Sequence, residues 1–219
     1  MHSIYDFITG PLLWISFGLF VGGSLYKLVR MIWLAYRKEA YIFSILSLKY
    51  SLRSILHWIT PFATVNMRKQ RVLTVVTFLF HICLFITPSF LLAHIVLLDE
   101  SWNISWWALP DLIADIMTIL TIAACLFFLV RRIQKPEVRY VTSSSDFGIL
   151  AIVAAPFLTG FWSYHQLPGY TTAFLLHIIS GELMLVAIPF TRLSHMLFSP
   201  FTRAYMGSEF GAYRHAKDW

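Results

Sequence analysis

Five long apolar stretches constrain the fold of this 219-residue chain more than any other feature. A helix of roughly 20 residues crosses about 30 Å of hydrocarbon, where a helix also satisfies its own backbone hydrogen bonds. The stretches predict transmembrane helices near residues 11–33, 72–98, 110–130, 147–165 and 171–198. Charged residues make up 13% of the chain, against about a quarter in a soluble domain. The sequence therefore predicts one all-α domain over residues 1–219, a polytopic membrane bundle in contact with the lipid bilayer.

The distribution of basic residues predicts the orientation of this bundle. All 17 Lys and Arg residues lie in three segments: from the end of the first stretch to the start of the second, between the third and fourth, and from the end of the fifth onwards. The opposite side carries Asp6, Asp99, Glu100 and Asp111 without any basic residue. The positive-inside rule then places the N-terminus in the periplasm and the C-terminus in the cytoplasm of a bacterial inner membrane. This arrangement requires an odd number of spans.

The segment near residues 41–60 is apolar, but it predicts an interfacial amphipathic helix rather than a sixth span. Lys49, Arg53 and His57 recur at intervals of four residues and therefore share one helical face. The opposite face is apolar and carries Ile42, Ile45, Leu46 and Leu52. Such a helix lies in the plane of the membrane surface. A sixth span would also break the charge asymmetry.

Four histidines inside the predicted spans are the strongest functional candidates, because ionisable residues within a membrane are costly. His81 and His94 lie on the second predicted helix, and His177 and His195 lie on the fifth. His177 and His195 are separated by about five helical turns and would share one face. Because the two helices run in opposite directions, His94 and His177 match in depth near the outer side, and His81 and His195 near the inner side. Facing imidazoles are good axial ligands of haem iron, so the pattern predicts two haem b groups. The alternative is that each histidine only hydrogen-bonds a neighbouring helix.

The spacing on the second helix fits this prediction less well. His81 and His94 are thirteen residues apart, which places them about 140° apart around an ideal helix. Pro88 lies between them and would kink the helix, which could turn both rings towards one partner. His57, on the interfacial segment, is the substitute for His81 if one ligand is assigned wrongly.

The segment HIISGELMLVAIPFTRLSH, residues 177–195, resembles the last helix of the gamma subunit of respiratory nitrate reductase, a five-helix dihaem cytochrome b. With the segments RRIQKPEVRY and DFGILAIVAAPFLTG, the chain is more similar still to cytochrome b subunits of transmembrane redox complexes in sulfate-reducing bacteria. The resemblance implies that His177 and His195 are haem ligands, with His94 and His81 as their partners. It also implies other membrane subunits, a periplasmic multihaem cytochrome c and a cytoplasmic iron–sulfur subunit. The nitrate reductase branch places a lysine beside its outer haem for quinol, and this chain has no basic residue on that side.

Four further polar residues have both functional and structural interpretations. Glu182, inside the fifth helix, is expected to relay a proton from menaquinol, to orient a ligand, or to be a satisfied structural group. Asp111 and Asp115 begin the third helix, where they favour either helix capping or proton acceptance at an outer quinone site. Arg192 is a candidate partner for a haem propionate, or it reaches towards anionic lipid.

Together these features predict a dihaem cytochrome b subunit that carries electrons across the membrane in anaerobic respiration. The donor would be a periplasmic cytochrome c or menaquinol, and the acceptor a cytoplasmic iron–sulfur subunit. The rival interpretations are a haem-free anchor subunit and a small proton channel. No phosphate-binding loop, zinc motif or nucleophile–base set is present in the sequence, and the positive charge follows from topology rather than from nucleic-acid binding.

Overall fold

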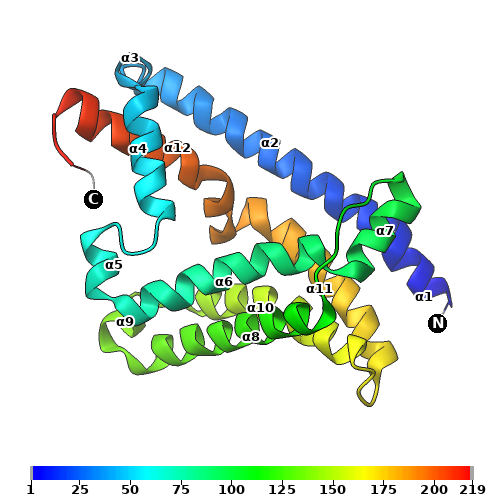
Figure 1. Ribbon diagram of the computed structural model, residues 1–219. Helices are drawn as coiled ribbons and strands as arrows, with labels where there is room; N and C mark the ends of the chain where they lie inside the picture. Colours follow the sequence, from blue (N-terminus) through cyan, green and yellow to red (C-terminus); the bar gives the residue numbers. More distant parts are fainter. Residues whose placement is uncertain (1, 218–219) are drawn as a thin grey trace. The chain divides into compact units, whose positions relative to one another are not determined.

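The computed structural model describes residues 2–217, and within this range the regular elements are all helices, with no β-strand (Figure 1). Five helices in the described range are long and apolar enough to cross a membrane. They are the continuous helical segment Ser3–Lys38, α6 (Arg71–Phe90), α8 (Asp111–Gln134), α10 (Ser144–Tyr164) and α11 (Tyr170–Phe190). This confirms the predicted all-α polytopic fold class.

The first spanning segment consists of three elements, and shorter helices lie between and after the spanning helices. The first spanning segment contains α1 (His2–Phe7), a π-helical turn (Ile8–Leu12) and α2 (Leu13–Lys38). The segments between the spanning helices contain α3 (Ile42–Ile45), α4 (Leu48–Ile59), α5 (Val65–Lys69), α7 (Leu92–Trp102) and α9 (Pro136–Val141). After α11 come a 3₁₀ turn (Arg192–Ser194), α12 (His195–Ser208) and a final π-helical turn (Glu209–Tyr213).

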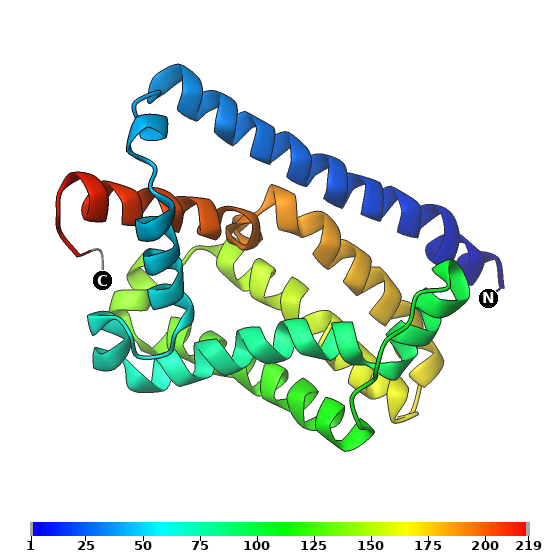
Figure 2. The same ribbon diagram turned by 45° about the horizontal axis from the view of Figure 1, so that its top comes forward.

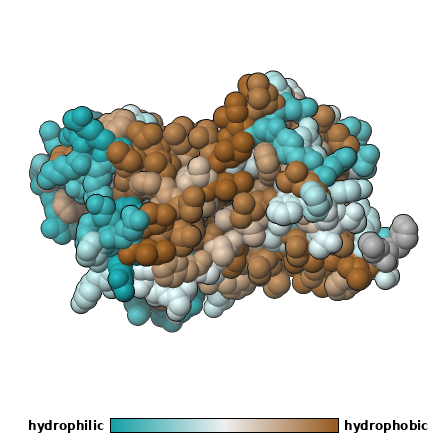
Figure 3. All heavy atoms as spheres, turned by 90° about the horizontal axis from the view of Figure 1, so that it is seen from below, coloured by the Kyte–Doolittle hydropathy of each residue, from teal (hydrophilic) through white to brown (hydrophobic). Residues whose placement is uncertain are grey.

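The spanning helices present large apolar side chains outwards, as a lipid environment requires. Leu112, Val72 and Leu126 are 71%, 68% and 58% exposed. Hydrophobic side chains cover much of the face seen in Figure 3. In water such an exposed apolar surface would be unfavourable, whereas in hydrocarbon it is the expected arrangement.

The chain divides into two compact units, which are described separately below. The central unit consists of residues 75–181, and the terminal unit consists of the described residues 2–74 and 182–217. The central unit holds α7, α8, α9, α10 and most of α6. The terminal unit holds α2, α4 and α12.

In the central unit, the predicted helix over 72–98 is two helices, because the chain is extended at Leu91 (φ −73°, ψ 129°). The proline three residues earlier lacks an amide hydrogen, which weakens this turn. The loop after α7 satisfies two of the carbonyls that the break leaves free. Trp106 Nε1 donates to the carbonyl of Ser89 (2.9 Å), and the Leu109 amide donates to that of Phe90 (2.9 Å). The break is therefore compatible with a membrane interior, where unpaired backbone groups are costly.

In the terminal unit, the expectation that one helix runs over 171–198 is wrong. Helix α11 ends at Phe190, and Thr191 is extended (φ −123°, ψ −169°). The Thr191 hydroxyl donates to the Ala187 carbonyl (2.7 Å) and accepts from the Leu193 amide (3.2 Å), so it caps both sides of the break. His195 begins α12, and it consequently does not share a face of one helix with His177.

The interfacial segment packs through small residues against α12, a helix of which only residues 195–198 fall within the predicted fifth span (Figure 2). The buried Ser51 hydroxyl donates to the Ala204 carbonyl (3.0 Å) and lies 3.0 Å from the Ser208 hydroxyl. At Gly207, an added Cβ would overlap the backbone carbonyl of Tyr50. Close approach of α4 and α12 therefore requires glycine at this position.

Substituting Gly207→Ala is expected to destabilise the α4–α12 contact by about 1–3 kcal/mol, because the new methyl group meets backbone rather than a flexible side chain. Thermal unfolding of the purified protein and protease sensitivity of the 60–64 connection would measure this loss. Gly22→Ala in α2 is the matched control, since nothing lies within 4 Å of a Cβ there. Equal stability of the two variants would contradict the packing described here.

Candidate functional site

The central unit brings two of the four candidate histidines together. His94 lies in the first turn of α7, and His177 lies in α11. Their ring centroids are 5.9 Å apart and their planes differ by 11°. Both side chains are half-buried. The sequence predicts that His94 and His177 lie at the same depth in the membrane, and in the structure their rings lie side by side.

Both rings are held in the same tautomer by a backbone carbonyl. His94 Nδ1 is 2.8 Å from the carbonyl oxygen of Pro88, and His177 Nδ1 is 2.8 Å from that of Pro156. A carbonyl can only accept, so each Nδ1 carries the proton and each Nε2 carries the lone pair. Within the described residues, no hydrogen bond is made to either Nε2. This is the tautomer in which histidine binds a metal through Nε2.

The helix break positions His94. Because α6 stops before Leu91, the carbonyl of Pro88 has no backbone amide one turn later within the same helix. The imidazole of His94 donates a hydrogen bond from Nδ1 to that carbonyl instead. The proline noted in the sequence as the source of a kink thus contributes its carbonyl oxygen to the site.

Gly160 on α10 makes room for the ring of His177. A Cβ at this position would lie 2.9 Å from both Cε1 and Nδ1 of His177. Real Cβ atoms do not approach a ring so closely, so any other residue would displace the imidazole. Sequence reasoning missed Gly160 and Pro156, which lie one helical turn apart in the segment PFLTG. A glycine one turn after a proline in a span was the only signal available.

His81 and His195 belong to different units, and each is described within its own. In the central unit, His81 Nδ1 is 2.7 Å from the Thr77 carbonyl, and the ring meets Phe80 edge to face. In the terminal unit, His195 Nδ1 is 2.9 Å from the carbonyl of Arg192. Both rings therefore have the same tautomer as His94 and His177.

The other candidate residues, Glu182, Asp111, Asp115 and His57, lie in three different surroundings. Glu182, in the terminal unit, is 4% exposed, and within the described residues its carboxylate oxygens have no hydrogen-bond partner. Asp111 and Asp115 instead face a small cavity in the central unit. His57, the substitute ligand, lies on α4 with Nδ1 3.1 Å from the Arg53 carbonyl.

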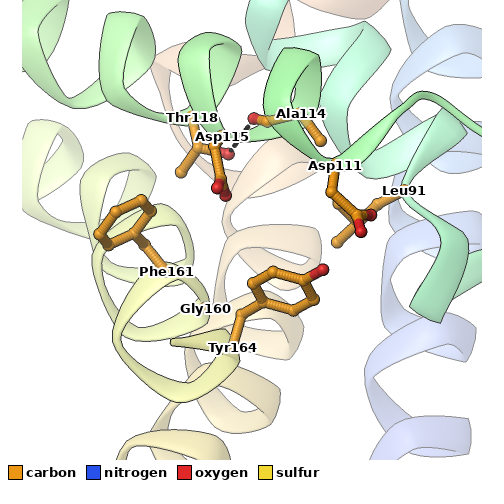
Figure 4. A pocket seen from close by; sticks show the side chains of 8 residues that line it. All are labelled: Leu91, Asp111, Ala114, Asp115, Thr118, Gly160, Phe161 and Tyr164. Atoms are coloured by element: carbon orange, nitrogen blue, oxygen red, sulfur yellow. Dashed lines mark hydrogen bonds between the residues drawn. The ribbon is translucent and has the colours of Figure 1, made fainter. Parts of the chain in front are cut away.

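This cavity, called here the α8–α10 cavity, has a volume of about 40 Å³ (Figure 4). Its lining residues are Leu91, Asp111, Ala114, Asp115, Thr118, Gly160, Phe161 and Tyr164. Asp115 Oδ1 is 3.1 Å from Nε2 of His165, the residue that ends α10. The side chains of Tyr164 and Asp111 both line the cavity (Figure 4). Gly160 lines the cavity and also contacts the ring of His177, so the cavity and the histidine pair share a wall.

No cluster of three or more histidine, cysteine or acidic side chains suited to a metal ion occurs among residues 2–217. A metal bound by protein side chains alone generally needs three or four ligands. A haem supplies four nitrogen ligands itself and needs only two axial residues. The donor set of this chain therefore suits a metal carried by a macrocycle better than a bare ion.

The helical fold and its five apolar helices in the described range define a multi-pass α-helical membrane protein. No known family model matches the chain. It is 39% identical over 218 residues to a protein of Nitratidesulfovibrio vulgaris (strain Hildenborough) that is named only "Protein", with 96% of this chain and 95% of the relative covered. The chain belongs to the same family as that protein.

Proposed function

We propose that this protein is a dihaem cytochrome b subunit of a membrane-bound respiratory redox complex. It carries electrons across the bacterial inner membrane between a periplasmic donor and a cytoplasmic iron–sulfur subunit. The observation that carries this proposal is the pairing of His94 with His177, with both Nδ1 atoms bonded to backbone carbonyls.

The separation of the two rings fits axial ligation of one iron. An imidazole nitrogen binds a transition metal at about 2.0 Å, and a ring atom lies about 1.1 Å from its centroid. Two rings on opposite sides of one iron therefore have centroids about 6.2 Å apart. The observed 5.9 Å is within a few tenths of an ångström of this value. Stacked rings in van der Waals contact would be closer.

A bound haem b would supply a one-electron iron couple, and the chain's own residues would set its surroundings. His94 and His177 would hold the iron through Nε2. The carbonyls of Pro88 and Pro156 fix the ring orientations and increase the basicity of the ligands. Gly160 allows His177 its position, and the apolar helices keep water away.

The second haem is proposed at His81 and His195. Support comes from their place in the sequence, from the resemblance to dihaem cytochromes, and from the Nδ1 hydrogen bonds to Thr77 and Arg192. Arg192 is the proposed partner of a propionate, because a guanidinium pairs well with carboxylates.

Charge supports the proposed partners. Asp99, Glu100 and Asp111 lie on the side without basic residues, which would attract a Lys-rich periplasmic cytochrome c. The basic side would dock the iron–sulfur subunit. Menaquinol is the other proposed donor, with Glu182, Asp111 and Asp115 as candidate proton acceptors. The 39% identical relative comes from a sulfate reducer, the group of bacteria in which the resembling cytochrome b subunits occur.

The purified chain is expected to contain two haem b groups, measured by a pyridine haemochrome assay and a reduced-minus-oxidised spectrum. His94→Ala and His177→Ala should each remove the same one haem, because they ligate one iron. His215→Asn is the matched control, since His215 lies near the C-terminus with a positive φ that asparagine tolerates. A well-folded preparation without haem would leave the anchor subunit as the function.

Substituting Gly160→Ala is expected to displace the His177 ring and lower the occupancy of that same haem several-fold. Any haem retained should show an altered ferric electron paramagnetic resonance spectrum, because that spectrum depends on the angle between the two ligand planes. Gly148→Ala on the same helix is the control, as nothing lies within 4 Å of a Cβ there. Identical spectra for the two variants would mean that Gly160 does not shape the haem site.

A further inference from the structure

The α8–α10 cavity is too small for an organic substrate but large enough for water. Small-molecule pockets are typically about 300–1,000 Å³, whereas a water molecule occupies about 30 Å³ of liquid volume. The cavity measures about 40 Å³ and has carboxylates, a hydroxyl and apolar rings on its walls. Its chemistry is therefore that of water and protons.

A chain of protonatable groups joins the protein surface to this cavity. The side chains of His165 and Asp115 are 35% and 28% exposed and lie 3.1 Å apart, where α8 begins and α10 ends. The pair therefore lies at the ends of two spanning helices rather than at mid-span. Asp111 and Tyr164 face the same cavity (Figure 4). On the far wall, Gly160 separates the cavity from the ring of His177.

The segments that contain the His94–His177 pair and the cavity carry no Lys or Arg, which determines what these protonatable groups can do. The sequence has no Lys or Arg between residues 72 and 130 or between 140 and 191. Asp111 and Asp115 of α8, Tyr164 of α10 and His165, which directly follows α10, are the titratable groups that line or adjoin the cavity. The imidazoles of His94 and His177 lie beyond Gly160. The other titratable groups of these helices lie away from the cavity lining: Asp99 and Glu100 of α7, Cys125, Arg131 and Arg132 of α8, and Asp146 of α10. An electron added in apolar surroundings is stabilised by a positive charge nearby, because Coulomb interactions are strong at low dielectric constant. Among the described residues no Lys or Arg lines the cavity, and those of the central unit lie at residues 131–139, from the far end of α8 onwards. Within this unit a proton is therefore the remaining source of positive charge beside the cavity.

We infer that the Asp115–His165 pair takes up one proton from the adjoining aqueous phase when the His94/His177 centre gains an electron, and returns it when that centre is oxidised. The inference rests on the proposed function. The electron comes from the donor, the iron is reduced by one unit, and the proton from water balances the added charge. Asp111 and Tyr164 hold the cavity water between the pair and the ligand side. Asp115 and His165 thus change the midpoint potential of the haem without being its ligands.

Redox potentiometry of the purified full-length protein tests this inference. The midpoint potential of the haem that His177→Ala removes should rise by up to about 59 mV for each tenfold rise in proton concentration, the value for one proton per electron. The measurement covers the range from about pH 6 to about pH 8. Asp115→Asn and His165→Gln should each reduce this slope roughly threefold or more. Infrared difference spectra on reduction should lose a carboxyl or imidazole band in the same variants.

Glu137→Gln is the matched control, because Glu137 is exposed on α9 and does not line the cavity. It should keep the slope of the parent protein. Unchanged haem content shows that a variant is folded, and if Asp115→Asn loses haem, His165→Gln decides the question. A potential independent of pH, or a slope that both variants leave unchanged, overturns the proton site while the haem count stands. A folded parent without haem overturns the proposed function and this inference with it.

Discussion

The hydrogen-bonding requirement of the backbone in hydrocarbon governs this structure. It forces the spanning segments to be helical, and it demands a partner for every carbonyl at a helix break. At the break before α7, three such carbonyls are satisfied by the loop and by His94. The requirement that restricts the fold therefore also orients a functional side chain. The carbonyl of Pro88 that His94 uses lies at the end of α6, where the break removes the backbone amide that would otherwise pair with it.

The predictable part of the fold was the part encoded in local pattern. Apolar runs of about 20 residues predict spans, and the confirmed fold class follows from them. The thirteen-residue spacing of His81 and His94 conflicted with a shared partner helix, because the angle between the two side chains was calculated for one ideal helix. The break at Leu91 removes that assumption, since the two residues lie on separate helices. Pro88 indicated a kink, but the position of the break depends on the loop that satisfies the carbonyls, which no local pattern contains.

Residues that contact a candidate ligand from a neighbouring helix were also missed, because local sequence pattern does not contain contacts between helices. Gly160 and Pro156 belong to α10, and their relation to His177 exists only once α10 and α11 are packed. Helix α12 was likewise hidden, because Thr191 interrupts a run that is otherwise apolar enough to read as one helix. The contact of α4 with α12 through Ser51 was missed as well, because the sequence pattern showed only a basic face and an apolar face. Tertiary contacts between helices, rather than the helices themselves, are what the sequence did not reveal.

Asp111 and Asp115 have different surroundings in the structure, although the sequence offered the same two interpretations for both. Helix α8 has Pro110 at its N-cap, with no side-chain cap hydrogen bond, and Asp111 in its first turn. An acid in that turn is favoured by the helix dipole, which gives Asp111 a structural reason. Asp115 lies beyond the first turn, where the dipole has little effect, and its carboxylate is bonded to His165 on another helix. Capping therefore does not account for Asp115, and its conjunction with a histidine beside the cavity is the stronger indication of a role in proton exchange.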